Sequence, residues 1–153
     1  MASRGGLAFD ARSESFGYQV NLLARLMAQL LQERIAPLGV APGQFAQLLA
    51  LYDADGQTAG ELARNIGIEP ATMTRTLQRM ERDGLVERRT DPLDRRASRI
   101  HLTARAVELE LPLKAAAVDA NKAVLSGLSK ASRADMLNAV TTCIGLAHAA
   151  LDA

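Results

Sequence analysis

Arginine is the residue type that could do the most chemistry in this chain of 153 residues, and it is concentrated in the middle. Residues 58–105 contain ten arginines and seven acidic residues, whereas residues 1–57 and residues 106–153 each contain one more acidic than basic residue. The planar guanidinium carries a fork of donors that matches phosphate groups and guanine edges. The local excess therefore indicates a polyanionic partner such as nucleic acid, although an ordinary solvated surface has the same composition.

A predicted helix over residues 70–83 would hold several of these polar side chains on one face. Met73, Leu77 and Met80 follow one another at steps of four and three, so they form its buried side. Arginine can donate two hydrogen bonds to guanine, glutamine can bracket adenine, and hydroxyls beside a helix N-terminus suit phosphate. A solvated helix face uses the same residue types, so the neighbouring elements decide between the two interpretations. Thr72 and Thr74 lie near the N-terminus of the helix, and the outward polar residues are Thr72, Arg75, Gln78, Arg79 and Arg82.

A β-hairpin is predicted directly after that helix, with strands over residues 85–89 and 98–102. Asp94, Arg95 and Arg96 fall at its tip. A narrow minor groove concentrates negative potential and attracts inserted arginine side chains. Asp94 lies two residues before Arg96 and could pair with its guanidinium, which would lower the ordering cost of binding. The alternative is a surface ion pair worth less than about 1 kcal/mol.

Short helices joined by tight turns are the elements that must position these side chains. A predicted helix over residues 59–66 ends at Gly67, because glycine suits the left-handed position after a helix. Pro70 then opens the next helix, where its missing N–H costs nothing. Two helices joined by a short turn that contains glycine form a helix-turn-helix unit. Pro42 opens an earlier helix, which ends before a turn over residues 53–56.

Long apolar stripes at both ends of the chain predict helices over residues 15–36 and 104–128. Pro112 predicts a kink or an interrupted first turn in the second of these helices. A last helix is predicted to begin near Ser132, which has capping-box-like spacing to Asp135. A winged domain is too small to cover these stripes, so we expect them to pair two subunits; one larger helical core in a monomer is the alternative.

Together these residues resemble the MarR family of winged-helix regulators over most of the chain. The most specific part is the wing pattern, in which Asp94 and Arg96 are followed by Leu102 and Thr103. Two departures from the family pattern are Ala106, where glycine is common, and Pro112. The other matching segments are Glu61-Leu62-Ala63, Pro70-Ala71-Thr72-Met73-Thr74-Arg75, Gly84-Leu85-Val86-Glu87-Arg88 and Asp91-Pro92-Leu93-Asp94-Arg95-Arg96.

The resemblance implies a mainly α fold with a small β-hairpin wing and long N- and C-terminal dimerisation helices. Residues 1–36 would contain a flexible tail, over residues 1–12, followed by the first dimerisation helix. Residues 37–103 would form the winged helix-turn-helix DNA-binding domain, and residues 104–153 the C-terminal dimerisation helices.

The resemblance also implies a homodimeric, sequence-specific transcriptional regulator that binds double-stranded DNA at a pseudopalindromic operator. The helix that begins at Pro70 would enter the major groove, and Arg96, held by Asp94, would enter the minor groove. Such proteins are usually repressors released by a small ligand, often an aromatic or phenolic acid, bound between the dimerisation helices and the winged domain. Polar residues of the first two helices could line this pocket or simply face the solvent. They are Gln19, Asn21, Arg25 and Gln47.

Other classes of function lack the residues that they need. The sequence shows no nucleophile–base constellation, metal-spaced cluster or glycine-rich phosphate loop, and His101 and His148 are its only histidines. We therefore expect no enzyme, no cofactor and no metal. Readers of single-stranded RNA stack bases on aromatic residues, and residues 58–105 contain none. A winged-helix module that binds only protein remains an alternative, which the arginine cluster disfavours.

Cys143 is the single cysteine, which fits a reducing cytoplasm. It lies on the apolar face of the predicted last helix, so we expect an inert core residue, with a redox-responsive regulator as the alternative. The sequence has no run of about 18 apolar residues and no hydrophobic signal segment, so we expect a cytoplasmic protein without a membrane partner.

Overall fold

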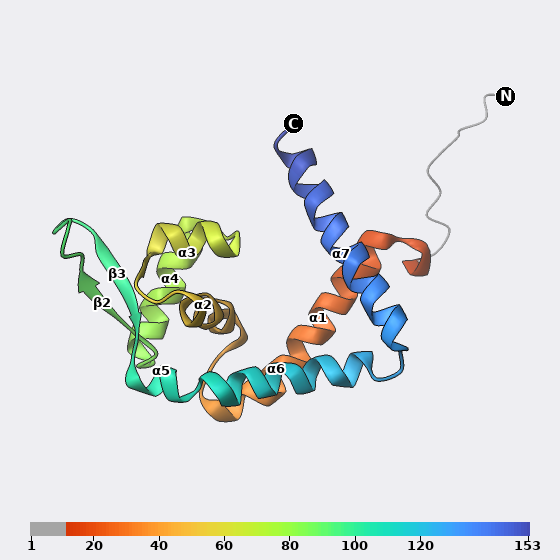
Figure 1. The fold of residues 1–153 in the computed structure, drawn as a ribbon, viewed down its shortest axis with the longest axis horizontal. Helices are drawn as coiled ribbons and strands as arrows, with labels where there is room; N and C mark the ends of the chain where they lie inside the picture. Colours follow the sequence, from red (N-terminus) through yellow and green to blue (C-terminus); the bar gives the residue numbers. More distant parts are fainter. Residues whose placement is uncertain (1–11) are drawn as a thin grey trace.

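The computed structural model describes residues 12–153, so the predicted tail over residues 1–12 lies outside the described residues except for Arg12. Figure 1 shows a winged unit at one end of the molecule and long helices at the other. The expected fold class, mainly α with a small β wing, is confirmed. The elements in chain order are η1 Arg12–Glu14, α1 Phe16–Ile35, η2 Ala36–Leu38, α2 Pro42–Asp53, β1 Gln57–Thr58, α3 Ala59–Ile66, α4 Pro70–Arg82, β2 Val86–Thr90, β3 Ser98–Leu102, α5 Ala104–Glu108, α6 Glu110–Leu125 and α7 Lys130–Leu151.

The sheet of the wing contains one strand more than the sequence predicts. Strands β2 and β3 form the expected hairpin, in an antiparallel register that pairs Arg88 with Ile100. Strand β1 pairs with the other edge of β3, with Gln57 opposite Ile100, and the strand order is β1-β3-β2. A strand of two residues has no periodicity, so its pairing becomes visible only in three dimensions.

The helix-turn-helix contains the local signals on which its prediction depended. Thr58 caps α3: its hydroxyl accepts a hydrogen bond from the Glu61 N–H at 3.2 Å, and the Glu61 carboxylate accepts one from the Thr58 N–H at 2.8 Å. The second of these bonds holds the pKa of Glu61 below its ordinary value. Gly67 follows with a φ of +74°, and Pro70 begins α4. The predicted range of α3, residues 59–66, is confirmed.

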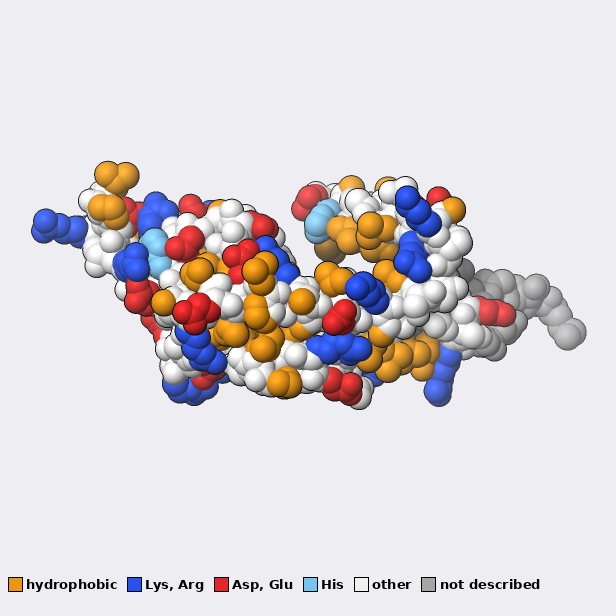
Figure 2. Space-filling model, turned by 60° about the horizontal axis from the view of Figure 1, so that its bottom comes forward, with side chains coloured by type: hydrophobic (Ala, Val, Ile, Leu, Met, Phe, Trp, Pro, Cys, Tyr) orange, Lys and Arg blue, Asp and Glu red, His pale blue; other side chains and the backbone are white. Residues whose placement is uncertain are grey.

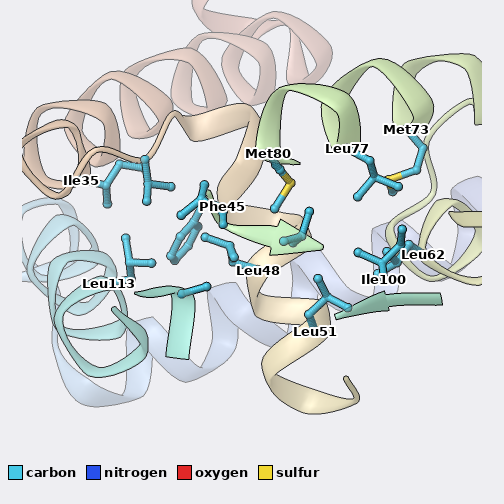
Figure 3. Packing of buried hydrophobic residues seen from close by; sticks show 14 of the residues in the cluster. Ile35, Phe45, Leu48, Leu51, Leu62, Met73, Leu77, Met80, Ile100 and Leu113 are labelled. Atoms are coloured by element: carbon cyan, nitrogen blue, oxygen red, sulfur yellow. The ribbon is translucent and has the colours of Figure 1, made fainter. Parts of the chain in front are cut away.

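The core fills the space between the helices and the sheet of the winged unit and continues to α1 and α6 (Figure 3). Met73, Leu77 and Met80 are all 0% exposed, which confirms the predicted inner face of α4. Ile35 of α1 and Leu113 of α6 belong to the same cluster, so one core fixes the winged unit to both long helices. The other fully buried large side chains are Leu48, Leu51, Leu62, Leu85 and Ile100.

The predicted helix over residues 104–128 is divided in two. Helix α5 ends at Glu108 and α6 begins at Glu110, so the break lies at Leu109. Pro112 lies in the first turn of α6, where proline is tolerated because the N–H groups of a first turn have no partner within the helix. The predicted interruption at this proline is confirmed.

The last helix begins earlier than expected. Its first residue is Lys130, and its cap is Ser129, whose hydroxyl accepts a hydrogen bond from the Ser132 N–H at 3.1 Å. The prediction that Ser132 caps this helix with Asp135 is therefore wrong. Both serines precede the apolar run, and only the extended backbone of Ser129, with a ψ of 160°, distinguishes the cap.

Tyr52 connects α2 to α5. Its hydroxyl donates a hydrogen bond to the Ala106 carbonyl oxygen at 2.6 Å. Burial, together with the nearby charge of Glu110, raises the pKa of Tyr52 to about 12, so the hydroxyl remains a donor at neutral pH. Ala106, one of the two departures from the family pattern, is fully buried, and its methyl group packs into the core.

The apolar face of α7 covers no part of this core. None of the residues of α7 is buried, and Cys143 is exposed, so the expectation of a core cysteine is wrong for the single chain. Helix α7 therefore adds no residue to the described core. Figure 2 shows further hydrophobic side chains gathered over the middle of the face where α5 and α6 lie. Exposed large apolar residues on the long helices include Phe16, Val20, Leu26, Leu111, Val118, Leu137, Ile144 and Leu146.

A helix that crosses a membrane must be both long and apolar. No single described helix is long and apolar enough to do so. Residues 16–38 and 42–53 meet those requirements only as a pair, and they are bent by 76° relative to each other. Phe45, Leu48 and Leu51 of the second segment are buried in the core.

Candidate nucleic-acid interface

The outer face of α4 is open to solvent along its whole length. Within the described part of the chain, the side chains of Arg75 and Gln78 have no hydrogen-bond partner. Thr74 Oγ1 donates to the Pro70 carbonyl oxygen at 3.0 Å, and Arg79 Nε donates to the Arg75 carbonyl oxygen at 3.4 Å. Arg75 and Gln78 therefore keep all their donors for a ligand, whereas Thr74 uses its one hydroxyl donor inside the helix. The predicted major-groove residues are all exposed: Thr72, Thr74, Arg75, Gln78 and Arg79.

The arginines of the wing divide into a bound group and a free pair. Arg88 Nε donates to both carboxylate oxygens of Glu81 on α4, at 3.0 and 3.1 Å. Arg89 Nε donates to Glu87 at 2.8 Å. Arg95 and Arg96, at the tip, are exposed and have no carboxylate partner among residues 12–153. Only the tip pair is therefore available to an external anion without breaking an ion pair.

Asp94 has a different part in the wing from the one expected. Its Oδ1 accepts a hydrogen bond from the backbone N–H of Arg96 at 2.9 Å, and its own carbonyl oxygen accepts one from the Ala97 N–H at 3.0 Å. The expected ion pair between Asp94 and the Arg96 guanidinium is absent from the described residues, so that prediction is wrong. Aspartate commonly bonds the backbone two residues further on, and here this bond shapes the turn rather than the arginine.

Asp91 is the structural residue of the wing that the sequence did not reveal. It is 5% exposed, and its carboxylate accepts from the Leu93 N–H at 2.8 Å and from Arg99 Nε at 2.6 Å. These bonds, led by the one from Leu93, hold the pKa of Asp91 below its ordinary value. Arg99 also donates to the Gly56 carbonyl oxygen at 2.9 Å, which ties β3 to the loop after α2. Arg99 thus belongs to the scaffold, although it is one of the ten arginines of residues 58–105 that indicate a polyanionic partner.

Replacing Asp91 by asparagine is expected to flatten the acid side of the stability curve. Because folding lowers the pKa of Asp91, its bonds stabilise the fold fully above the unfolded value of about 3.9 and are lost as pH falls through the lower folded value. Thermal melts of Asp91→Asn and wild type should therefore differ at neutral pH and converge below about pH 4. Asp135→Asn, on an exposed helix position, is the matched control. Parallel acid limbs for wild type and Asp91→Asn would contradict the assignment.

Asp55 gives the base of the wing a second attachment. Its Oδ1 accepts from the Leu102 N–H at 2.9 Å, and its Oδ2 lies 3.0 Å from His101 Nδ1. The sequence assigns Asp55 to turn chemistry alone, because the partner strand lies more than forty residues further along the chain. With the bond from Arg99 to Gly56, this contact fixes the wing to the loop that precedes the helix-turn-helix.

A separate apolar cavity of about 310 Å³ lies between α1, α2 and α6. None of the four polar residues named as possible pocket residues is among those that line it. Gln47 is buried at 3% exposure, so the expectation that it faces solvent is wrong, whereas Gln19, Asn21 and Arg25 are exposed. Asn121 is the one polar side chain of the lining, and no sequence pattern marked it. The lining residues are Met27, Ala28, Leu31, Phe45, Leu49, Ala117, Ala120 and Asn121.

An exposed polar helix in the second position of a helix-turn-helix, beside a hairpin with arginines at its tip, defines a winged helix-turn-helix protein. The model of the MarR family matches residues 38–97, which contain α2, α3, α4 and most of the wing. The chain is therefore similar to the MarR family over its winged unit, and to solved structures of MarR-family regulators over most of its length.

Three solved structures illustrate that similarity. A MarR transcriptional regulator from Methanosarcina mazei Go1 is 27% identical, with a TM-score of 0.79 over 86% of this chain and 94% of its own. The transcriptional repressor CouR, solved on a 23-mer DNA duplex, is 25% identical, with a TM-score of 0.77 over 92% and 99% of the two chains. PcaV from Streptomyces coelicolor, solved with its natural ligand, shares the fold at 21% identity, with a TM-score of 0.80 over 92% and 99%.

Proposed function

We propose that this protein is a sequence-specific regulator of transcription that binds double-stranded DNA with α4 in the major groove and the wing tip in the minor groove. The observation that carries the proposal is the free outer face of α4, on which Arg75 and Gln78 have no partner within the described chain. Thr72 and Arg79 extend this face, and Arg95 and Arg96 are the matching free cations of the wing. The similar protein CouR was solved bound to a DNA duplex, which supports the same partner here.

The proposal includes a homodimer acting on a pseudopalindromic operator. Leu137 and Leu146 of α7 are each 66% exposed, and Leu111 of α6 is 78% exposed. An apolar surface of this extent on long helices favours association, and a two-fold dimer is the commonest form that association takes. Residues 1–36 and 104–153 would then supply the dimer contacts, and residues 37–103 would bind DNA.

We further propose that the protein is a repressor that a small, possibly aromatic, ligand releases from DNA in the cytoplasm. The cavity between α1, α2 and α6 supports this, because it touches both the long helices and the winged unit. The similar protein PcaV was solved with its natural ligand. Regulators of this family act without catalysis, and we extend that to this chain. Release of a labelled duplex by members of an aromatic-acid panel would test the ligand response.

The DNA flanking the chain's own coding region is the first probe to use, with a scrambled duplex of equal length and composition as its control. Fluorescence anisotropy should show tighter binding to the native sequence than to the scrambled one. With six to ten phosphate contacts, affinity should fall by about 10³–10⁵-fold between about 50 and 200 mM salt, because phosphate contacts release counterions. Light scattering on the same sample should give the mass of a dimer. Binding that ignores salt, or no binding, would favour the module that contacts only protein.

A further inference from the structure

A second cavity, of about 290 Å³, lies where the N-terminus of α2 meets the C-terminal half of α4. It therefore adjoins the helix that carries the free arginines. Its lining is polar: two guanidinium groups, a hydroxyl, an amide side chain and a carboxylate. The lining residues are Ala41, Gly43, Gln44, Thr76, Arg79, Arg82 and Asp83.

Thr76 is the residue that marks this cavity as a site rather than a surface hollow. It is 5% exposed, and its hydroxyl has no hydrogen-bond partner in the described chain although it lines the cavity. The surrounding chain therefore holds the side chain in place, while its oxygen stays open to the cavity and free to bond a ligand there. Thr74, two residues earlier, shows the alternative: its hydroxyl donates a hydrogen bond to a carbonyl oxygen of its own helix, and Thr76 makes no such bond.

Gly43 places one backbone donor at the same cavity. It is the second residue of α2, and its N–H is the free donor of the first turn, because Pro42 has no N–H and the Gln44 N–H donates to the Ala41 carbonyl oxygen at 2.9 Å. A Cβ atom at Gly43 would meet no heavy atom within 4 Å, so there is open space beside this residue. The helix terminus, the unpartnered hydroxyl and the two arginines all favour an anion.

The carboxylate of Asp83 repels an anion in the cavity less than its position suggests, because both of its oxygens already have partners in the chain. Its Oδ2 accepts from Gln44 Nε2 at 2.7 Å, and its Oδ1 lies 3.6 Å from Arg82 Nε. Gln44 is held in turn, because its Oε1 accepts from the Ala41 N–H at 3.0 Å. Two guanidinium groups against one carboxylate leave the lining with a net positive charge.

We propose that this cavity binds one phosphate of the DNA backbone, with Thr76, Arg79 and the Gly43 amide as donors. The inference rests on the proposed function and refines it, because it assigns Arg79 to a phosphate rather than to a base. A phosphate held here would fix the position of α4 along its groove from the flank of the helix, since phosphate contacts set register without reading sequence.

Two substitutions test the proposal without touching the core. Thr76→Val removes only the hydroxyl and keeps the shape of the side chain. Gly43→Asp adds a negative charge that is favourable for α2 itself, since it lies in the first turn of a helix, but that repels phosphate. The controls are Thr141→Val, on an exposed helix face, and Ala131→Asp, which has the same position in the first turn of α7.

The readout is anisotropy of wild type and variants on a labelled mixed-sequence duplex about three helical turns long, across a salt series. We expect each cavity variant to lose about tenfold in affinity with an unchanged melting temperature. Gly43→Asp alone should also lower the salt slope, by about one per cavity, because Thr76→Val removes a hydroxyl and no charge. The two control variants should match wild type. Cavity variants that keep the affinity and slope of wild type overturn the inference.

Two further outcomes separate this inference from the proposed function. If wild type binds no duplex, the proposed function fails and the inference fails with it; if wild type binds and the cavity variants bind equally well, only the inference fails. Inorganic phosphate distinguishes the source of the anion. Millimolar phosphate that shifts the Gly43 amide resonance, combined with cavity variants that bind DNA normally, would assign the site to a free anion and overturn the DNA contact.

Discussion

Arg75→Ala is expected to abolish recognition of the operator while leaving the protein folded and associated. Arg75 is exposed on the middle of α4, and its guanidinium has no partner within the described residues. A bidentate arginine–guanine contact discriminates between bases by about 1–3 kcal/mol. A dimer would lose this contact in both half-sites, so operator affinity should fall by about a hundredfold or more. Anisotropy on the operator and on a scrambled duplex measures the loss, which should be much smaller on the scrambled sequence.

The matched control for this experiment is Arg25→Ala, an exposed arginine of α1 outside the winged unit. It removes the same charge, so a general electrostatic effect would weaken both variants alike. Light scattering should give the same mass for wild type and both variants. Operator affinity that is unchanged in Arg75→Ala would remove this residue from base readout and would take away the main support for α4 as the reading helix.

Leu77→Ala is expected to cost about 2–5 kcal/mol in the free energy of unfolding, because it leaves a cavity in a close-packed core. Leu77 is 0% exposed and lies on the inner face of α4, between Met73 and Met80 (Figure 3). The substitution would weaken the packing of the helix that carries Arg75 against the core. Chemical denaturation at a fixed protein concentration measures the effect, since association contributes to apparent stability.

Leu93→Ala is the matched control, because it makes the same leucine-to-alanine change at a fully exposed position. Leu93 lies at the wing tip and is 95% exposed, so its truncation should leave the free energy of unfolding within about 0.5 kcal/mol of wild type. Equal destabilisation by the two substitutions would show that α4 does not pack against the core through Leu77 as the structure describes.

The parts of the fold that local signals specify could be predicted from the sequence. The step pattern of Met73, Leu77 and Met80 gives the inner face of α4, and burial confirms it. The bounds of α3 follow from a capping box at Thr58 and a left-handed Gly67, both of which act within one helical turn. Short-range geometry decides these features, so no distant residue could change them.

The parts that depend on distant partners could not be predicted. Asp91 and Arg99 read as a turn residue and a surface cation, yet they bond each other, and Arg99 also bonds Gly56, forty-three residues away. The sequence does not specify the partner of Asp94, because a carboxylate two residues before an arginine can reach either its backbone or its guanidinium. It predicts a core position for Cys143 because an apolar helix face predicts burial without saying which chain supplies the cover.

The uncovered apolar face of α7 has a consequence for the level of this protein in the cell. None of its residues is buried, and most of the stability of a helix in a protein comes from packing of its apolar face. If the proposed homodimer supplies the cover, a newly made copy carries a frayed, adhesive C-terminal segment until it meets a second one. Quality-control proteases act on such segments, so dilute copies would be degraded and paired copies would survive. Synthesis below a threshold rate would then leave the proposed operator unoccupied, and the proposed repression would be a sharper function of gene expression than binding alone provides.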